Sequence, residues 1–300
     1  MRKEVTDEPP EQRIREQAMR LPPGGAVTGW AGCRIAGAAF LDGLGRDGQV
    51  RRPVQLAVGP RGGIRRDDQV IVSHERLPEW EVWVRHGIRV ARPERAVFDE
   101  MRRHGRREAL VVADCALAGR ITSLQRLCAY AATHRSARRF KVVDWALARA
   151  SEHARSPNEV RTRTIAEEVA GFPRLLVNVV VLDVLGRRIG EVDLLDPEAG
   201  LVIEFDGADH REGPRHSHDI TKEDRLRRAG LEVVRVTGSH LGDEVLLIER
   251  LRVARERAGR RLPYERRWSV AARAFDLETW LREREDLALW HENLSPAVGW

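Results

Sequence analysis

Two short apolar strands that carry acidic side chains are the most constraining feature of this 300-residue sequence. Residues 191–207 read EVDLLDPEAGLVIEFDG, with an alternating run around Asp193, a turn at 196–200, and a second apolar run that ends in Glu204 and Asp206. Side chains two residues apart share a face of a strand, and an antiparallel partner can bring Asp193 beside both acids. The pattern therefore predicts a hairpin with carboxylates gathered on one face.

Carboxylates gathered on one face repel one another unless positive charge lies between them. Mg²⁺ suits such a cluster, because it takes one or two protein carboxylates and completes its octahedron with waters and phosphate oxygens. The alternative is a solvent-facing hairpin whose acids only solubilise a sheet edge, but both strands are too apolar for that role. We therefore expect a Mg²⁺ site here, with Mn²⁺ as a substitute.

Helix and strand signals surround the hairpin. Ser156 is an N-cap candidate followed by proline and then by Glu159 at the third helical position, so a helix is expected through Glu168. The other expected elements follow from apolar runs and from a glycine stop. They are a strand at 175–183, a strand from Ile189, a helix at 218–229, a strand at 231–237 and a helix at 242–258. The predicted class is α/β, with the element order αβββαβ and a closing helix.

Several segments between Ser156 and Leu241 resemble the PD-(D/E)xK nuclease superfamily. The likeness is carried by SPNE, EVDLL, VIEFDGADH and KEDRLRRAGLEVVRV, and it is closest to the branch similar to the very short patch repair endonuclease. The resemblance implies a restriction-endonuclease-like core that cuts DNA with Mg²⁺ held by the strand acids. Members of this group sometimes serve instead as inactive relatives that only bind DNA.

The resemblance assigns roles residue by residue. Asp193 matches the first metal-binding aspartate, Glu204 the second acid, and Glu159 the helix glutamate that often completes the site. Asp206 stands where the family pattern has lysine, so it is expected to be a further ligand or a base that orients water. Glu159 has an alternative role, because a glutamate at the third helical position can cap its own helix.

The missing motif lysine has one candidate replacement. The sequence contains only three lysines, and Lys222 is the one within this region. It lies on the helix after the hairpin, from which it could reach a metal-bound water. The alternative is a surface lysine that pairs with acidic neighbours on its own helix.

Histidines follow the acidic strand. The resemblance places His210 near the scissile phosphate, where it could donate a proton to the leaving oxygen; the alternative is an ordinary loop histidine. His216 and His218 lack matching cysteines, so a zinc site is not expected.

Residues 21–150 resemble the carboxy-terminal part of AbiEi-type antitoxins. PPGGAVTGWAGCRIAG, GIRVARPERAVFDE and EALVVADCALAGRIT carry this likeness, which implies a cognate toxin protein as a partner. Only about twenty residues precede PPGG, fewer than the operator-binding winged helix of that family needs, so a scaffold or targeting module is the alternative. The expected elements are a helix at 27–40, strands at 54–58, 69–73 and 82–84, and helices at 96–101, 107–117 and 123–132.

Length and charge suggest how the chain is divided. We expect a charged leader at 1–20, a smaller α+β domain at 21–150, the nuclease-like domain at 151–260, and a charged tryptophan-rich tail at 261–300. Residues 1–150 hold 28 basic and 18 acidic side chains, whereas 151–300 hold 24 and 28. A basic first half suits contacts with nucleic-acid phosphates.

Other classes of protein are disfavoured. Three widely spaced cysteines, Cys33, Cys115 and Cys128, give neither a disulfide framework nor a zinc motif, which fits the cytoplasm. No apolar run is long enough for a membrane span, and the charged start lacks the apolar core of a signal peptide. The sequence therefore predicts a cytoplasmic metal-dependent endodeoxyribonuclease; the alternative is a non-catalytic DNA-binding or antitoxin-like regulator.

Overall fold

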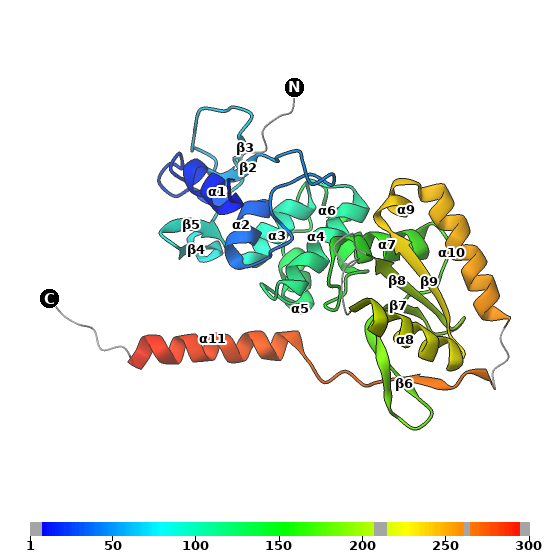
Figure 1. Cartoon of the computed structure of the whole chain (residues 1–300). Coiled ribbons are helices and arrows are strands. Elements are labelled where there is room, and N and C mark those ends of the chain that lie inside the picture. Colours follow the sequence, from blue (N-terminus) through cyan, green and yellow to red (C-terminus); the bar gives the residue numbers. More distant parts are fainter. Residues whose placement is uncertain (1–7, 207–214, 261–264, 295–300) are drawn as a thin grey trace. The chain divides into compact units, whose positions relative to one another are not determined.

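The computed structural model describes residues 8–206, 215–260 and 265–294, and of these it leaves out the side chains of 215–220 and 288–294. The chain forms two compact units (Figure 1). The first comprises residues 1–152 and 275–300, and the second comprises 153–274. Both contain a five-stranded mixed sheet with helices, so the predicted α/β class is confirmed at this level.

The sheet of the first unit has the strand order β3-β2-β1-β5-β4. Its strands are β1 (Ala26–Thr28), β2 (Val54–Ala57), β3 (Val70–Ser73), β4 (Val82–Arg85) and β5 (Ile88–Ala91). Its helices are α1 (Pro10–Ala18), α2 (Gly29–Ala36), α3 (Pro93–Met101), α4 (Arg106–Ala118), α5 (Leu124–Ala132), α6 (Phe140–Leu147) and α11 (Leu277–Leu294), with a 3₁₀ turn at Glu79–Glu81.

Two expectations for the first unit were wrong. Residues 27–40 do not form one helix, because Val27 pairs with Leu56 and Val90 in the sheet and α2 begins only afterwards. Gly29 makes this change of direction at φ 60°, where a Cβ would lie 2.0 Å from the Gln55 amide oxygen. The first unit is also the larger of the two, since it spans residues 1–152 and 275–300 and the second spans only 153–274.

The second unit follows the predicted order. It contains α7 (Pro157–Glu168), β6 (Leu176–Asp183), β7 (Arg188–Asp196), β8 (Leu201–Asp206), α8 (Arg215–Arg228), β9 (Glu232–Thr237), α9 (Gly238–Gly242), α10 (Glu244–Gly259) and β10 (Trp268–Val270). The sheet order is β10-β6-β7-β8-β9. The β6-β7-β8 meander is antiparallel, and β9 joins β8 in parallel through the α8 crossover.

Alternating apolar side chains build the core of this unit. Val192, Val202 and Val233 from three strands form one buried cluster with Leu226 of α8. Trp268 of β10 packs against this cluster, so the start of the predicted tail completes the sheet as an edge strand. None of the helices in the described ranges combines the length and apolar character needed to cross a membrane.

Candidate functional site

The β7-β8 hairpin brings Asp193 and Glu204 together. The antiparallel register pairs Leu194 with Ile203, so Asp193, one residue before Leu194, and Glu204, one residue after Ile203, lie beside each other. The backbone N–H of Phe205 donates a hydrogen bond of 2.8 Å to Asp193 Oδ2, which fixes that carboxylate against the neighbouring strand. The structure therefore places two of the predicted ligands side by side.

The carboxyl group of Asp193 has a strongly perturbed acidity. Burial raises the pKa of Asp193 to about 7, and the negative charges of Glu204 and Glu159 act in the same direction. The Phe205 hydrogen bond and the charge of Lys222 oppose this rise in pKa but do not cancel it. A cation bound beside this carboxyl group would stabilise its ionised form and lower its pKa.

Lys222 reaches the two acids from α8. Its Nζ lies 2.8 Å from Glu204 Oε1, and this ion pair is only partly exposed. The aliphatic stem of Lys222 lies across Gly190 of β7, where a Cβ would come within 3.0 Å of Lys222 Cγ. Gly190 thus leaves room for the lysine to cross the strand toward Glu204, so a surface role paired within its own helix is wrong for Lys222.

Glu159 is held mainly as a capping group. The Ser156 hydroxyl accepts a hydrogen bond from the Glu159 backbone N–H, and the Glu159 carboxylate accepts from Arg155 N at 3.1 Å and from Asn178 Nδ2 at 2.8 Å. Its charge still raises the pKa of Asp193, which places it close to the pair. Asn178 was not predicted as a site residue; the signal available was one amide in an apolar strand, and its φ of 46° shows the unusual backbone there.

The remaining predicted residues lie at or beyond the end of β8. Asp206 is half-buried and pairs with Thr237 of β9, and within the described part of the chain no hydrogen bond or ion pair joins it to Asp193 or Lys222. His210 lies outside the described residues. The backbones of His216 and His218 belong to α8, but their side chains lie outside the description.

A divalent cation would find few protein ligands here. Across residues 8–206, 215–260 and 265–294, no group of three or more His, Cys, Asp or Glu side chains is close enough together to hold a metal ion. Asp193 and Glu204 form a smaller set of two carboxylates. Two carboxylates suit Mg²⁺, which takes its other ligands from water and phosphate. The raised pKa of Asp193 agrees with this donor set, because burial and then the negative charges of Glu204 and Glu159 disfavour its ionised form, and Lys222 does not offset them.

Comparisons of the chain with protein-family models, with curated proteins and with solved structures found no match.

Proposed function

We propose that the second unit hydrolyses phosphodiester bonds of DNA with a divalent cation, on a restriction-endonuclease-like core. The observation that carries this proposal is the convergence of Asp193, Glu204 and Lys222 from three consecutive elements of the sheet unit. The same αβββαβ order with two strand acids and a lysine characterises the PD-(D/E)xK superfamily that the sequence resembles.

The roles of the residues follow from their positions. Asp193 and Glu204 would hold the cation, which polarises the phosphate and lowers the pKa of an attacking water. Lys222 lies within hydrogen-bond reach of Glu204, so its ammonium can orient that water or balance the charge that develops on the phosphate oxygens. The water oxygen bonds to phosphorus, the bond from phosphorus to the ester oxygen breaks, and the proton that the water loses balances the proton that the leaving oxygen takes up.

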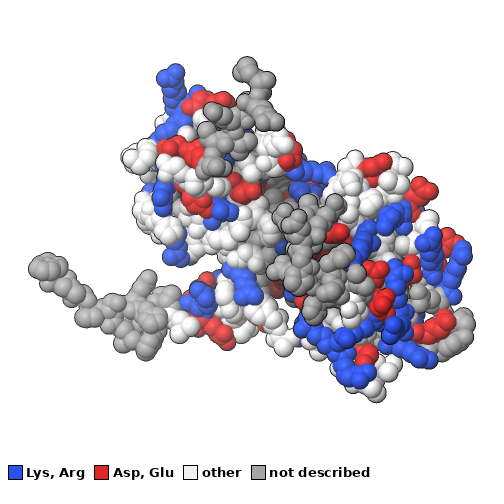
Figure 2. Space-filling model, in the orientation of Figure 1, with Lys and Arg blue, Asp and Glu red and all other residues white. Residues whose placement is uncertain are grey.

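Surface charge on this unit supports a polyanionic substrate. Exposed arginines lie on two of its helices, and Figure 2 shows Lys and Arg side chains gathered over this part of the molecule. They include Arg225, Arg227 and Arg228 on α8, and Arg250, Arg252, Arg257 and Arg260 on α10. Arginines of this kind contact backbone phosphates and give salt-dependent affinity.

The test is cleavage of supercoiled plasmid and of mismatched or branched duplexes in Mg²⁺ or Mn²⁺. We expect cleavage by the native protein that EDTA and Asp193→Ala both abolish. Asp224→Ala is the matched control, because Asp224 is an exposed acid of the same unit on α8 and is not one of the proposed ligands, so this variant should cleave normally. Cleavage that persists in Asp193→Ala at the native rate would contradict the assignment.

DNA binding without cleavage is the second candidate function. It is favoured by the Lys222–Glu204 ion pair, which satisfies an acid that would otherwise be free to bind a cation. Under this alternative all variants would bind duplex DNA in a salt-dependent manner and none would cut it. An antitoxin role for the first unit, with a toxin protein as its partner, stays a prediction from the sequence resemblance.

A further inference from the structure

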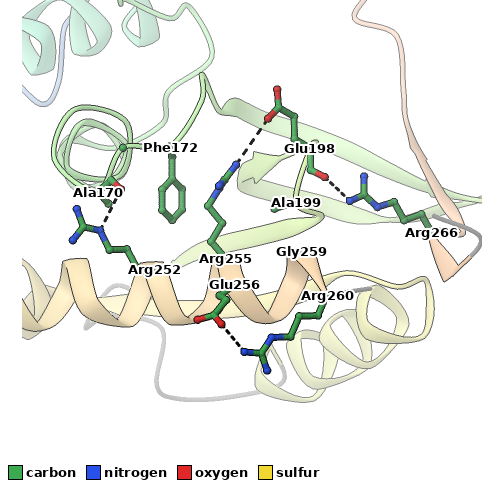
Figure 3. A pocket seen from close by; sticks show the side chains of 11 residues that line it. Ala170, Phe172, Glu198, Ala199, Arg252, Arg255, Glu256, Gly259, Arg260 and Arg266 are labelled. Carbon is green, nitrogen blue, oxygen red and sulfur yellow. Dashed lines mark hydrogen bonds and ion pairs between the residues drawn. The ribbon is translucent and has the colours of Figure 1, made fainter. Parts of the chain in front are cut away.

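A second feature of this unit is a pocket of about 680 Å³ beside α10 (Figure 3). It is bounded by the segment after α7, the β7-β8 turn, α10 and the segment before β10. Four arginines and two glutamates line it: Arg252, Arg255, Arg260, Arg266, Glu198 and Glu256. Together with the buried Asp196 that pairs with Arg255, these groups carry four positive and three negative charges.

Two of the four guanidinium groups are balanced by carboxylates. Arg255 Nε donates to Asp196 Oδ2 at 2.8 Å, and Asp196 is fully buried. Arg260 pairs with Glu256 at 2.5 Å across one turn of α10, with both side chains exposed. These two arginines have little charge left for a ligand.

The other two arginines contact only neutral groups within the described residues. Arg252 donates to the carbonyl oxygens of Ala170 at 3.3 Å and Val169 at 3.2 Å. Arg266 donates to the carbonyl oxygen of Glu198, and its Nε is buried with no hydrogen-bond partner in the described structure. A carbonyl oxygen orients a guanidinium but does not neutralise it, so Arg252 and Arg266 are the two lining guanidiniums without a carboxylate partner in the described structure.

Both arginines are held in place by their surroundings. Arg252 is on α10, and its neighbour Arg255 lies over the Phe172 ring at 5.3 Å in a cation–π contact. The segment of Arg266 is fastened to the α8-β9 turn, because Arg267 N donates to Ala229 O at 2.8 Å. In the view of Figure 3, Arg252 and Arg266 lie on either side of Arg255. Arg252 itself is oriented by its hydrogen bonds to the Ala170 and Val169 carbonyls. Charged donors oriented in this way lose less entropy when an anion binds.

We propose that this pocket binds a phosphate group through Arg252 and Arg266. A guanidinium offers parallel N–H donors that match two oxygens of one phosphate. Two guanidiniums without carboxylate partners therefore suit a phosphate, which has more oxygens and more negative charge than a carboxylate ligand. The pocket is larger than one phosphate and has room for a sugar-phosphate segment. The identification of that segment as part of DNA rests on the proposed function.

The pocket is distinct from the acidic pair. Asp196, which anchors Arg255, follows Asp193 by three residues on β7, which corresponds to about 10 Å of strand. Because three is an odd number, the two side chains leave opposite faces of the strand. The pocket therefore anchors a phosphate without taking part in hydrolysis.

The experiment compares two double variants of the full chain in EDTA, where cleavage cannot occur. Arg252→Gln with Arg266→Gln removes the two guanidiniums that lack a carboxylate partner, and Arg187→Gln with Arg188→Gln removes two exposed charges at the β6-β7 turn that lie outside the lining and outside the arginine surface of α8 and α10. Fluorescence anisotropy with a labelled duplex is measured over a range of salt concentrations. The same proteins are tested with inorganic phosphate and a mononucleotide by thermal shift.

We expect the pocket variant to bind the duplex more weakly than the control and to lower its salt slope by about two phosphate contacts. Loss of stabilisation by phosphate or mononucleotide alone, with duplex binding equal to the control, would identify the ligand as a small phosphate compound. Equality with the control in both arms overturns the proposal.

If the glutamine variant does not fold, the Arg252→Lys and Arg266→Lys pair is expected to keep the salt slope and weaken binding. A protein that never cuts DNA but shows pocket-dependent binding would refute the hydrolytic function and leave the phosphate site standing.

Discussion

Asp193 is the residue whose chemistry depends most on its surroundings. With a pKa of about 7 it is half protonated at neutral pH in the metal-free protein. A cation ligand must be ionised, so cation binding at this site should release protons and should strengthen as pH rises.

The raised pKa of Asp193 also predicts how stability depends on pH. An acid whose pKa is higher in the folded than in the unfolded chain lowers the free energy of unfolding when it is ionised. This loss of stability develops as pH rises from about 4 to 7. Asp193→Asn removes that charge and keeps an oxygen for the Phe205 N–H. We expect it to raise the free energy of unfolding above pH 7 and to lose this advantage near pH 4. Urea unfolding in EDTA at several pH values, with Asp224→Asn as a control, measures this; a gain independent of pH would contradict it.

Lys222 is expected to matter for cleavage more than for binding. Lys222→Met keeps an unbranched stem across Gly190 and removes the charge beside Glu204. Loss of one well-placed electrostatic group costs about 10²-fold or more in turnover. Single-turnover cleavage and duplex affinity separate the two effects. Arg225→Met, on the exposed surface of the same helix, should retain native turnover; equal losses in both variants would mean that Lys222 acts only through general surface charge.

At the scale of elements, the start of α7 supports the site. The Ser156 hydroxyl caps the helix at the Glu159 N–H, and the same turn positions the Glu159 carboxylate on Asn178. Ser156→Ala should lower the free energy of unfolding by about 1 kcal/mol. Ser269→Ala, at an exposed position of β10, should leave it nearly unchanged. Denaturant unfolding distinguishes them, and equal stability of both variants would argue against the cap.

The α8-β9 turn fastens the segment that carries Arg266. Gly230 has φ 90°, and a Cβ there would lie 2.2 Å from Glu265 O, whereas Gly186 has φ 74° and no heavy atom within 4 Å of its Cβ position. Gly186→Ala therefore measures the backbone cost alone, about 1 kcal/mol. We expect Gly230→Ala to cost clearly more and also to weaken phosphate binding, as read by thermal unfolding and anisotropy. Equal costs for the two variants would show that the 265–267 segment is not held by this turn.

Local patterns predicted most elements of the second unit because its strands alternate and its helices carry clear starts and stops. They failed where long-range pairing decides the structure. β1 is three residues long and exists because Val27 pairs with two distant strands, and β10 exists because Trp268 pairs with Asp183 of β6. Both segments are too short to show a clear local strand pattern. They are strands because of partners that lie far away in the sequence.

The candidate site was predictable to the same extent. Asp193 and Glu204 could be placed together from the alternation of one hairpin. The approach of Lys222 depends on the α8 crossover and on Gly190, and the role of Asn178 depends on how α7 meets β6. Such contacts between elements are set by tertiary packing, which the sequence pattern does not encode.

For the whole molecule, charge is distributed more evenly between the two structural units than between the two halves of the sequence. Counted by unit, the first holds 30 basic and 25 acidic side chains and the second holds 22 and 21. The excess is therefore five and one, smaller for the first unit than its sequence half suggests. The acidic helix α11 accounts for most of the difference, because it belongs to the first unit, where it pairs with Arg126 of α5.

Glu278 links α11 to the rest of the first unit. Burial alone would raise the pKa of Glu278, but hydrogen bonds from Arg126, Ser123 and Arg282 outweigh burial and lower it to about 2. A lowered pKa stabilises the folded state above the unfolded pKa of about 4.3, and the benefit is lost as pH falls toward 2. Glu278→Gln should therefore destabilise the first unit at pH 7 and differ less from the native protein near pH 3.

Hydrogen exchange measured by mass spectrometry can assign that loss to one unit. We expect faster exchange in α5 and α11 of Glu278→Gln and native exchange in residues 153–274, because all three partners of Glu278 belong to the first unit. Glu283→Gln removes an exposed acid from the same helix and should exchange like the native protein. Faster exchange throughout both units would mean that the two unfold as one cooperative body, and unchanged exchange in α5 would mean that α11 is not anchored through Glu278.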